Sequence, residues 1–314
     1  MLKRMRSFLV LVMLFITVTM SAQVTTATMS GKVTAQDEPI IGATIVAVHE
    51  PSGTRYGTVT NVSGQFNLQG MRTGGPYKVE ISYVGYQTAI YKGINLLLGE
   101  NYVLNVSLKE SSELLDEVVV TASKESNMKS DRAGAIMNAN RDMISNTPTI
   151  SRSISDIMRL SPQGADVGNG FAVGGGNYRQ SFVTVDGAAF NNTFGLGGNL
   201  PANGSPISLD ALEQVTVAVT PFDVRQSGFT GGAINAVTRS GDNQFRGTVY
   251  GYFNNENLRG DKVEDYKLTR SKSQYYTYGA SFGGPIIKDK LFFFVNGEYE
   301  DNVTAGSSYQ HVHL

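Results

Sequence analysis

The chain has 314 residues, with 26 basic and 27 acidic side chains, a net charge of −1 and no cysteine. Near neutrality speaks against a nucleic-acid binder, which carries a basic patch, and the lack of cysteine excludes disulfides and thiolate metal sites. Glycine occurs 35 times, and tyrosine and phenylalanine occur 15 times each, a composition that favours short strands and tight turns.

The first 22 residues have the layout of a secretory signal peptide. Basic residues in Met1–Arg6 precede an apolar run, Phe8–Val18, and Ser21-Ala22 follow it. The run is too short for a spanning helix, which needs about 20 residues. We therefore predict export with cleavage after Ala22; the alternative is an N-terminal membrane anchor. No later stretch is apolar enough for a spanning helix. Membrane insertion as a β-barrel is not excluded, because each barrel strand gives a much weaker sequence signal than a spanning helix does.

The next region, placed at 23–110, is predicted to be a β-sandwich of about seven strands. Apolar and polar residues alternate in three runs, which puts one face of each strand into a core. Turn residues such as Pro51-Ser52-Gly53 and Gly74-Gly75-Pro76 separate the strands. The apolar members of the three runs are Phe66, Leu68, Tyr77, Val79, Ile81, Tyr83, Leu104, Val106 and Leu108.

Three stretches of this region resemble the carboxypeptidase regulatory-like domain. They read GKVTAQDEPIIGATIVAV, GTVTNVSGQFNLQGM and YKVEISYVGYQT. The resemblance covers about 80 residues and implies a non-catalytic β-sandwich.

Residues 111–130 are predicted to be a linker, because Ser, Glu, Lys, Asp and Asn dominate them without a sustained period. One apolar island interrupts the linker and reads DEVVVTAS, residues 116–123. Its three consecutive valines favour an extended backbone.

The region 131–242 is predicted to mix helix and strand. A helix is expected at Ser151–Leu160, and a short helix at Ser208–Glu213 with Leu209 and Leu212 facing inward. The predicted strands are Phe182–Asp186, which runs into an Asp186-Gly187 turn, Val215–Val219 and Gly231–Thr238.

The region 243–314 is predicted to contain antiparallel strands. Long polar stretches alternate with a tight charged turn at Lys288-Asp289-Lys290, as the long outer loops and short inner turns of an outer-membrane barrel do. The residues expected to face lipid are Phe245, Val249, Phe253, Leu291, Phe293, Val295 and Tyr299.

Four stretches in register resemble the plug of TonB-dependent outer-membrane receptors and its junction with the barrel. They read SISDIMRLSPQG, SFVTVDGAAFNN, SLDALEQVTVAVTP and GFTGGAINAVTRSGDNQFRGTVYGYF, and GGPIIKDKLFFFVNGEYE resembles an early barrel hairpin of the Oar-like branch. The resemblance implies a mainly β protein: a sandwich, a mixed α/β plug and the first strands of a transmembrane barrel. A complete barrel of about 22 strands is wide enough to leak without a plug.

The same resemblance identifies DEVVVTAS as a TonB box, with Asp116, Glu117, Val118, Val119, Val120 and Thr121 as the TonB contacts. An unpaired β-prone segment can add to the sheet edge of a periplasmic TonB-type protein, which then pulls on the plug. The alternative is a linker strand docked on the chain's own sandwich.

The Gly- and Asn-rich stretch Asn191–Gly204 is predicted to be a plug loop that faces substrate, and the alternative is an uninvolved surface loop. The residues assigned to it are Asn191, Asn192, Phe194, Asn199 and Asn203. The resemblance further implies outer-membrane lipid and a surface lipoprotein as partners, with the plug and the sandwich on the periplasmic side of a Gram-negative outer membrane.

An enzymatic function is not predicted, and neither is a cofactor or a metal. The histidines are His49, His311 and His313, and no carboxylate or cysteine cluster accompanies the HVHL pair. Two other functions stay open: a non-transporting surface or adhesion protein on the same scaffold, and an accessory module of a secreted enzyme. Because the region after residue 240 supplies only three or four strands, the sequence is expected to be a receptor truncated early in the barrel.

Overall fold

The computed structural model describes residues 25–110, 118–121, 136–149, 152–167, 170–190, 207–219, 231–258, 260, 262–264, 266–267 and 272–304. Its contacts form two compact units. The first holds most of the chain up to Thr238, and the second holds Pro51–Thr54, Ser208–Ala211 and Arg239–Leu314. Among the described residues, no helix combines the length and the apolar character needed to cross a bilayer.

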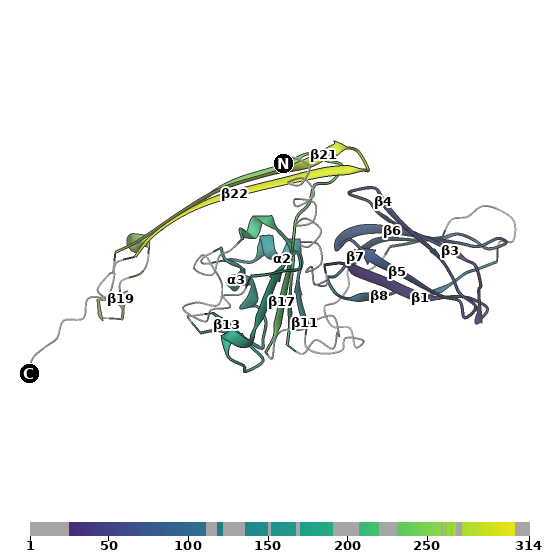
Figure 1. The fold of residues 1–314 in the computed structure, drawn as a ribbon, viewed down its shortest axis with the longest axis horizontal. Helices are drawn as coiled ribbons and strands as arrows, with labels where there is room; N and C mark the ends of the chain where they lie inside the picture. Colours follow the sequence, from purple (N-terminus) through teal and green to yellow (C-terminus); the bar gives the residue numbers. More distant parts are fainter. Residues whose placement is uncertain are drawn as a thin grey trace, which may run out of the picture. The chain divides into compact units, whose positions relative to one another are not determined.

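A sandwich of two sheets begins the first unit (Figure 1). One sheet has the order β2-β1-β5, with β8 and β9 also paired to β1, and the other has the order β10-β7-β6-β3-β4. The first sheet comprises β1 (Ala27–Ala35), β2 (Glu38–Pro39), β5 (Gln65–Met71), β8 (Asn101–Val103) and β9 (Val106–Ser107). The second comprises β3 (Thr44–His49), β4 (Thr54–Val59), β6 (Gly74–Ser82), β7 (Ala89–Leu96) and β10 (Val118–Thr121).

The period-two pattern correctly predicted the sandwich core. Eight of the nine apolar residues named from the sequence are buried; the exception is Tyr83, which is 37% exposed because β6 ends at Ser82. The strand number was underestimated, since short strands such as β2 and β9 have no alternation long enough to read. Around the core, Tyr77 is fully buried, and its ring lies 5.0 Å from that of His49.

Burial raises the pKa of Tyr77 well above the ordinary value of 10.0, and the neighbouring Tyr56 raises it further. Its phenol donates a hydrogen bond of 2.7 Å to the carbonyl of Arg72. The Tyr77 phenol therefore stays protonated in the folded protein at pH values where it ionises in the unfolded chain. Its contribution to the free energy of unfolding is complete below about pH 10 and is lost as the pH rises beyond that value.

Tyr77→Phe is thus expected to lower the stability of the sandwich by about 1 kcal/mol at neutral pH and to flatten its decline above about pH 10. Urea midpoints of the sandwich transition, measured at about pH 8 and about pH 11, check both effects. An unchanged alkaline slope in the variant would contradict the assignment of that slope to Tyr77.

A mixed α/β region follows, built on a five-stranded sheet with the order β11-β16-β17-β14-β15. Two short helices, α2 and α3, lie beside this sheet (Figure 1). Their buried side chains are Ile144 of α2 and Ile157 and Met158 of α3. The sheet comprises β11 (Ile136–Ala139), β14 (Phe182–Val185), β15 (Ala188–Ala189), β16 (Leu212–Ala218) and β17 (Ala233–Thr238). A separate two-stranded sheet comprises β12 (Gly164–Asp166) and β13 (Phe171–Val173). The helices are α2 (Arg141–Asn146), α3 (Ile154–Met158) and the 3-10 helices η2 (Tyr178–Gln180) and η4 (Leu209–Ala211).

The two helix predictions here were too long. Of the predicted helix Ser151–Leu160, the structure describes residues 152–160, and within these only Ile154–Met158 is helical. The helix begins after Ser153, whose N–H donates to the Asp156 carboxylate at 3.4 Å. Of Ser208–Glu213, only Leu209–Ala211 forms a helical turn, because Leu212 already pairs with Thr238 as the first residue of β16. The Asp186-Gly187 turn is confirmed, with positive φ at both residues.

One row of polar residues crosses this sheet from strand to strand. Asn138, Thr216, Asn235 and Thr184 are register neighbours on β11, β16, β17 and β14, and all four are buried. The Thr216 hydroxyl donates to Oδ1 of Asn138 at 2.5 Å, and the Thr184 hydroxyl donates to Oδ1 of Asn235 at 2.7 Å. Side-chain hydrogen bonds therefore reinforce the backbone ladder between β11 and β16 and between β14 and β17.

The second unit contains an open three-stranded antiparallel sheet with the order β18-β21-β22 (Figure 1). The tight turn at Lys288-Asp289-Lys290 is confirmed, with Asp289 at a φ of 62° and a 3.1 Å hydrogen bond from Lys290 N–H to Ile287 carbonyl. The elements are β18 (Arg246–Asn255), η5 (Glu256–Leu258), β19 (Lys262–Val263), β20 (Tyr266–Lys267), β21 (Ser273–Ile287) and β22 (Leu291–Thr304).

Candidate functional site

The two faces of the β18-β21-β22 sheet differ in chemistry, because side chains alternate along each strand. The apolar face is exposed: Val249 is 88% exposed, and Val295 and Tyr299 are 64% and 66% exposed. Phe245 stacks on Phe282 on this face, with ring centroids 5.9 Å apart. The opposite face carries polar side chains, and two of its transverse rows form the candidate site.

The first row joins Tyr250, Gly279 and Glu298, which are register neighbours on β18, β21 and β22. A Cβ on Gly279 would lie 2.2 Å from the Tyr250 ring, so glycine is required for the ring to lie across β21. Tyr250 thereby reaches over the middle strand and donates its phenolic hydrogen to the Glu298 carboxylate. The tyrosine and the carboxylate meet only because the residue between them has no side chain.

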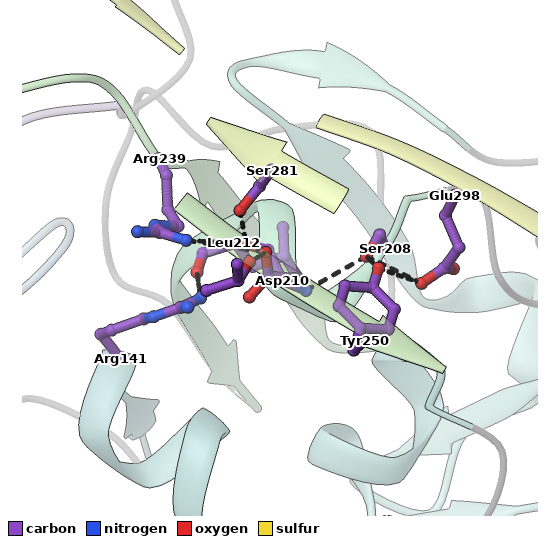
Figure 2. Close-up of polar contacts among 9 residues, drawn as sticks. Arg141, Ser208, Asp210, Leu212, Arg239, Tyr250, Ser281 and Glu298 are labelled. Atoms are coloured by element: carbon purple, nitrogen blue, oxygen red, sulfur yellow. Dashed lines mark hydrogen bonds and ion pairs between the residues drawn. The ribbon is translucent and has the colours of Figure 1, made fainter. Parts of the chain in front are cut away.

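Ser208, which precedes η4, completes this contact. Its hydroxyl lies 2.8 Å from the Tyr250 phenol and 3.0 Å from Oε2 of Glu298 (Figure 2). The same hydroxyl accepts the N–H of Asp210 at 3.2 Å, which fixes the start of the helical turn. Ser208 is buried and lies 90 residues from Glu298 in sequence.

Asp210 binds the second row. The Thr248 hydroxyl donates to Oδ2 of Asp210 at 2.6 Å and lies 2.6 Å from the Ser281 hydroxyl. Because the single Thr248 proton goes to the carboxylate, Ser281 donates to Thr248. Arg239 lies on the other side, with its guanidinium 3.7 Å from Oδ2 of Asp210. Both charged side chains are largely buried, so this ion pair is screened less than a surface pair.

Arg239 also joins the residues that flank the β16–β17 hairpin. Ala211 directly precedes β16 and Arg239 directly follows β17. The Arg239 N–H donates to the Ala211 carbonyl at 2.8 Å, and its guanidinium donates to the Asp210 carbonyl at 3.3 Å. The guanidinium further lies 4.9 Å from the centroid of the Phe294 ring, at cation–π distance.

We call Ser208, Asp210, Arg239, Thr248, Tyr250, Ser281 and Glu298 the polar clamp. It contains hydroxyls, two carboxylates and one guanidinium, and its chemistry is that of reversible hydrogen bonding rather than nucleophilic attack. Among the described residues, no group of three or more histidine, cysteine or acidic side chains is arranged to hold a metal ion. The clamp therefore suits the holding and release of a chain segment.

The structure places part of the DEVVVTAS segment on the sandwich. Val118–Thr121 forms β10, which pairs in parallel with β7. The prediction of an unpaired linker segment is wrong for these four residues, because β7 offers an open edge to an extended backbone. Asp116 and Glu117 lie outside the described residues, and the TonB contact of all six stays a prediction.

The other site residues singled out from the sequence either lie outside the described residues or belong to the sandwich. The structure does not describe His311, His313 or the five predicted loop residues, which are Asn191, Asn192, Phe194, Asn199 and Asn203. His49 is buried in the sandwich core beside Tyr77. The substrate-facing role of the five loop residues stays a prediction.

Sequence reasoning missed the polar clamp entirely. A signal was present in the alternation along the strands. Tyr250 and Glu298 lie on the face opposite to the predicted lipid-facing residues, and Gly279 lies between them on that same face. Pairing them required the strand register, and adding Ser208 required a contact over 90 residues.

Comparisons with known proteins agree with these observations. Residues 28–109 match the carboxypeptidase regulatory-like domain, and residues 237–313 match an outer membrane beta barrel domain. The TonB-dependent transporter Oar of Myxococcus xanthus is 32% identical over 151 residues, 46% of this chain and 14% of that protein. The TonB-dependent receptor SusC of Bacteroides thetaiotaomicron is 27% identical over 294 residues, 88% of this chain and 27% of that protein. The chain is thus similar to TonB-dependent receptors over most of its length.

The predicted resemblance to TonB-dependent receptors and the predicted mainly β fold are thus confirmed, and the similarities indicate a Gram-negative outer membrane as the location. The chain spans only 14% and 27% of the lengths of these two relatives. The solved siderophore receptor PirA of Acinetobacter baumannii is 21% identical with a TM-score of 0.42, over 53% of this chain and 24% of that one.

Proposed function

We propose that the chain carries the plug, the coupling segment and the first wall strands of a receptor for energised uptake across the outer membrane. The polar clamp is the observation that carries the proposal. Its hydrogen bonds hold the residues that flank β16 and β17 against the wall strands β18, β21 and β22, and hydrogen bonds of this kind can break and re-form. Similarity to a transporter and to a receptor favours uptake over a purely adhesive role. A TonB-type periplasmic protein is the proposed partner, and its proposed contact is Asp116–Thr121, which we call the coupling segment.

Force is proposed to reach the clamp through β11 and β16. The coupling segment precedes β11, which is the outer strand of the α/β sheet. Ile136 pairs with Ala218 and Ala139 pairs with Val215, so tension on β11 loads β16 directly. η4 comes immediately before β16, and its Asp210 bonds Thr248 and Arg239. Release of the clamp would detach the residues on either side of the β16–β17 hairpin from the wall strands and let the plug rearrange.

The proposed loop Asn191, Asn192, Phe194, Asn199 and Asn203 would then contact the substrate, whose chemical class stays open. Outer-membrane lipid would cover the apolar face that carries Val249 and Val295. A surface lipoprotein is a further proposed partner, on the family resemblance alone.

Gly279→Ala is expected to loosen the clamp, since the new Cβ would lie 2.2 Å from the Tyr250 ring and displace the phenol from Glu298 and Ser208. Losing these hydrogen bonds between partly buried groups is expected to cost about 1–3 kcal/mol. Cells whose receptor carries the variant should become more sensitive to a large antibiotic that the intact outer membrane excludes, such as vancomycin.

Gly297→Ala is the matched control, because a Cβ at Gly297 on the same sheet meets no atom within 4 Å. This variant should leave antibiotic sensitivity unchanged at equal receptor abundance. Equal sensitivity of the Gly279→Ala and Gly297→Ala cells would contradict the proposed gating role of the clamp.

A further inference from the structure

Four residues of the coupling segment form the strand β10, which pairs with the sandwich strand β7. Val118, Val119, Val120 and Thr121 pair in parallel with Ala89, Ile90, Tyr91 and Lys92 of β7. β10 is the outer strand of its sheet, and β7 would be the outer strand without it. Ala89 and Ile90 are buried, at 8% and 3% exposure, so the pairing closes a sheet edge beside the sandwich core.

A second contact fixes the chain just before this strand. Glu110 forms an isolated antiparallel bridge with Tyr86, and the Gln87 N–H donates to the Lys109 carbonyl at 2.9 Å. The Gln36 side chain also donates to the Glu110 carboxylate at 3.2 Å. The chain therefore meets the sandwich at residue 110, beside the segment that leads into β7, and again at residue 118, beside the first residue of β7.

The strand that pairs with β7 overlaps the proposed binding site of the TonB-type protein. That site is Asp116–Thr121, and four of its six residues are already paired with β7. A strand-adding protein binds through main-chain groups along the same stretch, and a docked strand offers it one edge of four residues instead of a free backbone. Docking on β7 thus lowers the fraction of molecules in which the whole segment is available, and the apparent affinity for a partner falls by that fraction.

We propose that the sandwich is an autoinhibitory domain, in which the edge of β7 stores the coupling strand and competes with the TonB-type partner for it. The inference rests on the proposed function. In the stored state the segment is held by β7, and coupling begins when β10 leaves. The sandwich then sets how readily the receptor is engaged, without contacting the transported substrate.

A reversible crosslink tests the competition. The chain contains no cysteine, so Lys92→Cys with Thr121→Cys introduces the only thiols. The two positions are register partners on adjacent strands, which lie about 4.8 Å apart, within the Cα separation a disulfide spans. Lys92 is exposed, so its replacement leaves the core intact. The probe is the purified periplasmic domain of the TonB-type protein of the same cell, added to the full chain in detergent.

Oxidation is expected to weaken binding of this domain at least about tenfold, and reductant should restore it. The control is Lys32→Cys with Gln65→Cys, an exposed register pair of β1 and β5, whose oxidation should leave binding unchanged. Binding that is unaffected by the crosslink between β7 and β10 would overturn the competition and leave the proposed function standing. Failure of that crosslink to form, while the control disulfide forms, would overturn the docking itself. No binding by the native chain would overturn the proposed function, and the competition with it.

Discussion

Val119→Pro is expected to abolish energised uptake while leaving the sandwich and the α/β region folded. Proline removes one N–H from the extended segment and is excluded from the interior of a paired strand. Loss of this hydrogen bond and of about one more beside it, because the proline ring crowds the backbone of the preceding residue, costs roughly 0.5–1.5 kcal/mol each. Together they correspond to roughly a 5- to 150-fold loss of affinity for an added strand. Because β10 is the outer strand of its sheet, the substitution leaves the pairing of β7 with β6 in place.

The measurement has two parts. Capture of the full chain by the purified TonB-type periplasmic domain should fall by that factor. In cells whose receptor carries Val119→Pro, substrate should still bind at the surface while uptake falls to the level seen without TonB. Ser126→Pro, seven residues further along the predicted linker, is the matched control and should retain both activities. Normal uptake by the Val119→Pro receptor would sink the assignment of the coupling segment.

The sequence predicted those features that depend on local periodicity. Tyr77, Val79 and Ile81 alternate with charged and polar neighbours, and burial follows that alternation because a strand in a two-layer sandwich has one inner face. The lipid-facing assignment of Val249 and Val295 rests on the same rule, and both are exposed on one face of the sheet. The Asp186-Gly187 turn followed from the conformations these two residues tolerate.

Contacts that depend on register or on distant segments could not be predicted. Ser208 meets Glu298 only because η4 lies against two strands whose pairing brings Tyr250 and Glu298 together across Gly279. The docking of Val118–Thr121 uses main-chain groups, which every extended residue has, so the valines reveal a tendency to extend but no partner. At Leu212, the pairing with Thr238 overrode a local pattern that also fits a helix.

Residues 23–314 made in water are expected to precipitate or to bind detergent, whereas residues 23–240 should remain soluble and monomeric. Within the described residues, the β18-β21-β22 sheet is open at both edges and presents Phe245, Val249, Phe282, Val295 and Tyr299 to solvent. Apolar patches and unpaired strand edges of this kind drive association. The shorter chain loses the sheet and uncovers Ser208 and Asp210 of the clamp, which are polar and are readily hydrated.

The comparison is made by expressing both chains without detergent and measuring the monomer fraction by size exclusion. Val249→Asn with Val295→Asn in the longer chain should raise that fraction, since both side chains belong to the exposed apolar face. Thr277→Asn, on the polar face of the same sheet, is the matched control and should not raise it. If the longer chain is as monomeric as the shorter one, the exposed face does not require lipid, and the placement of these strands in the membrane wall fails.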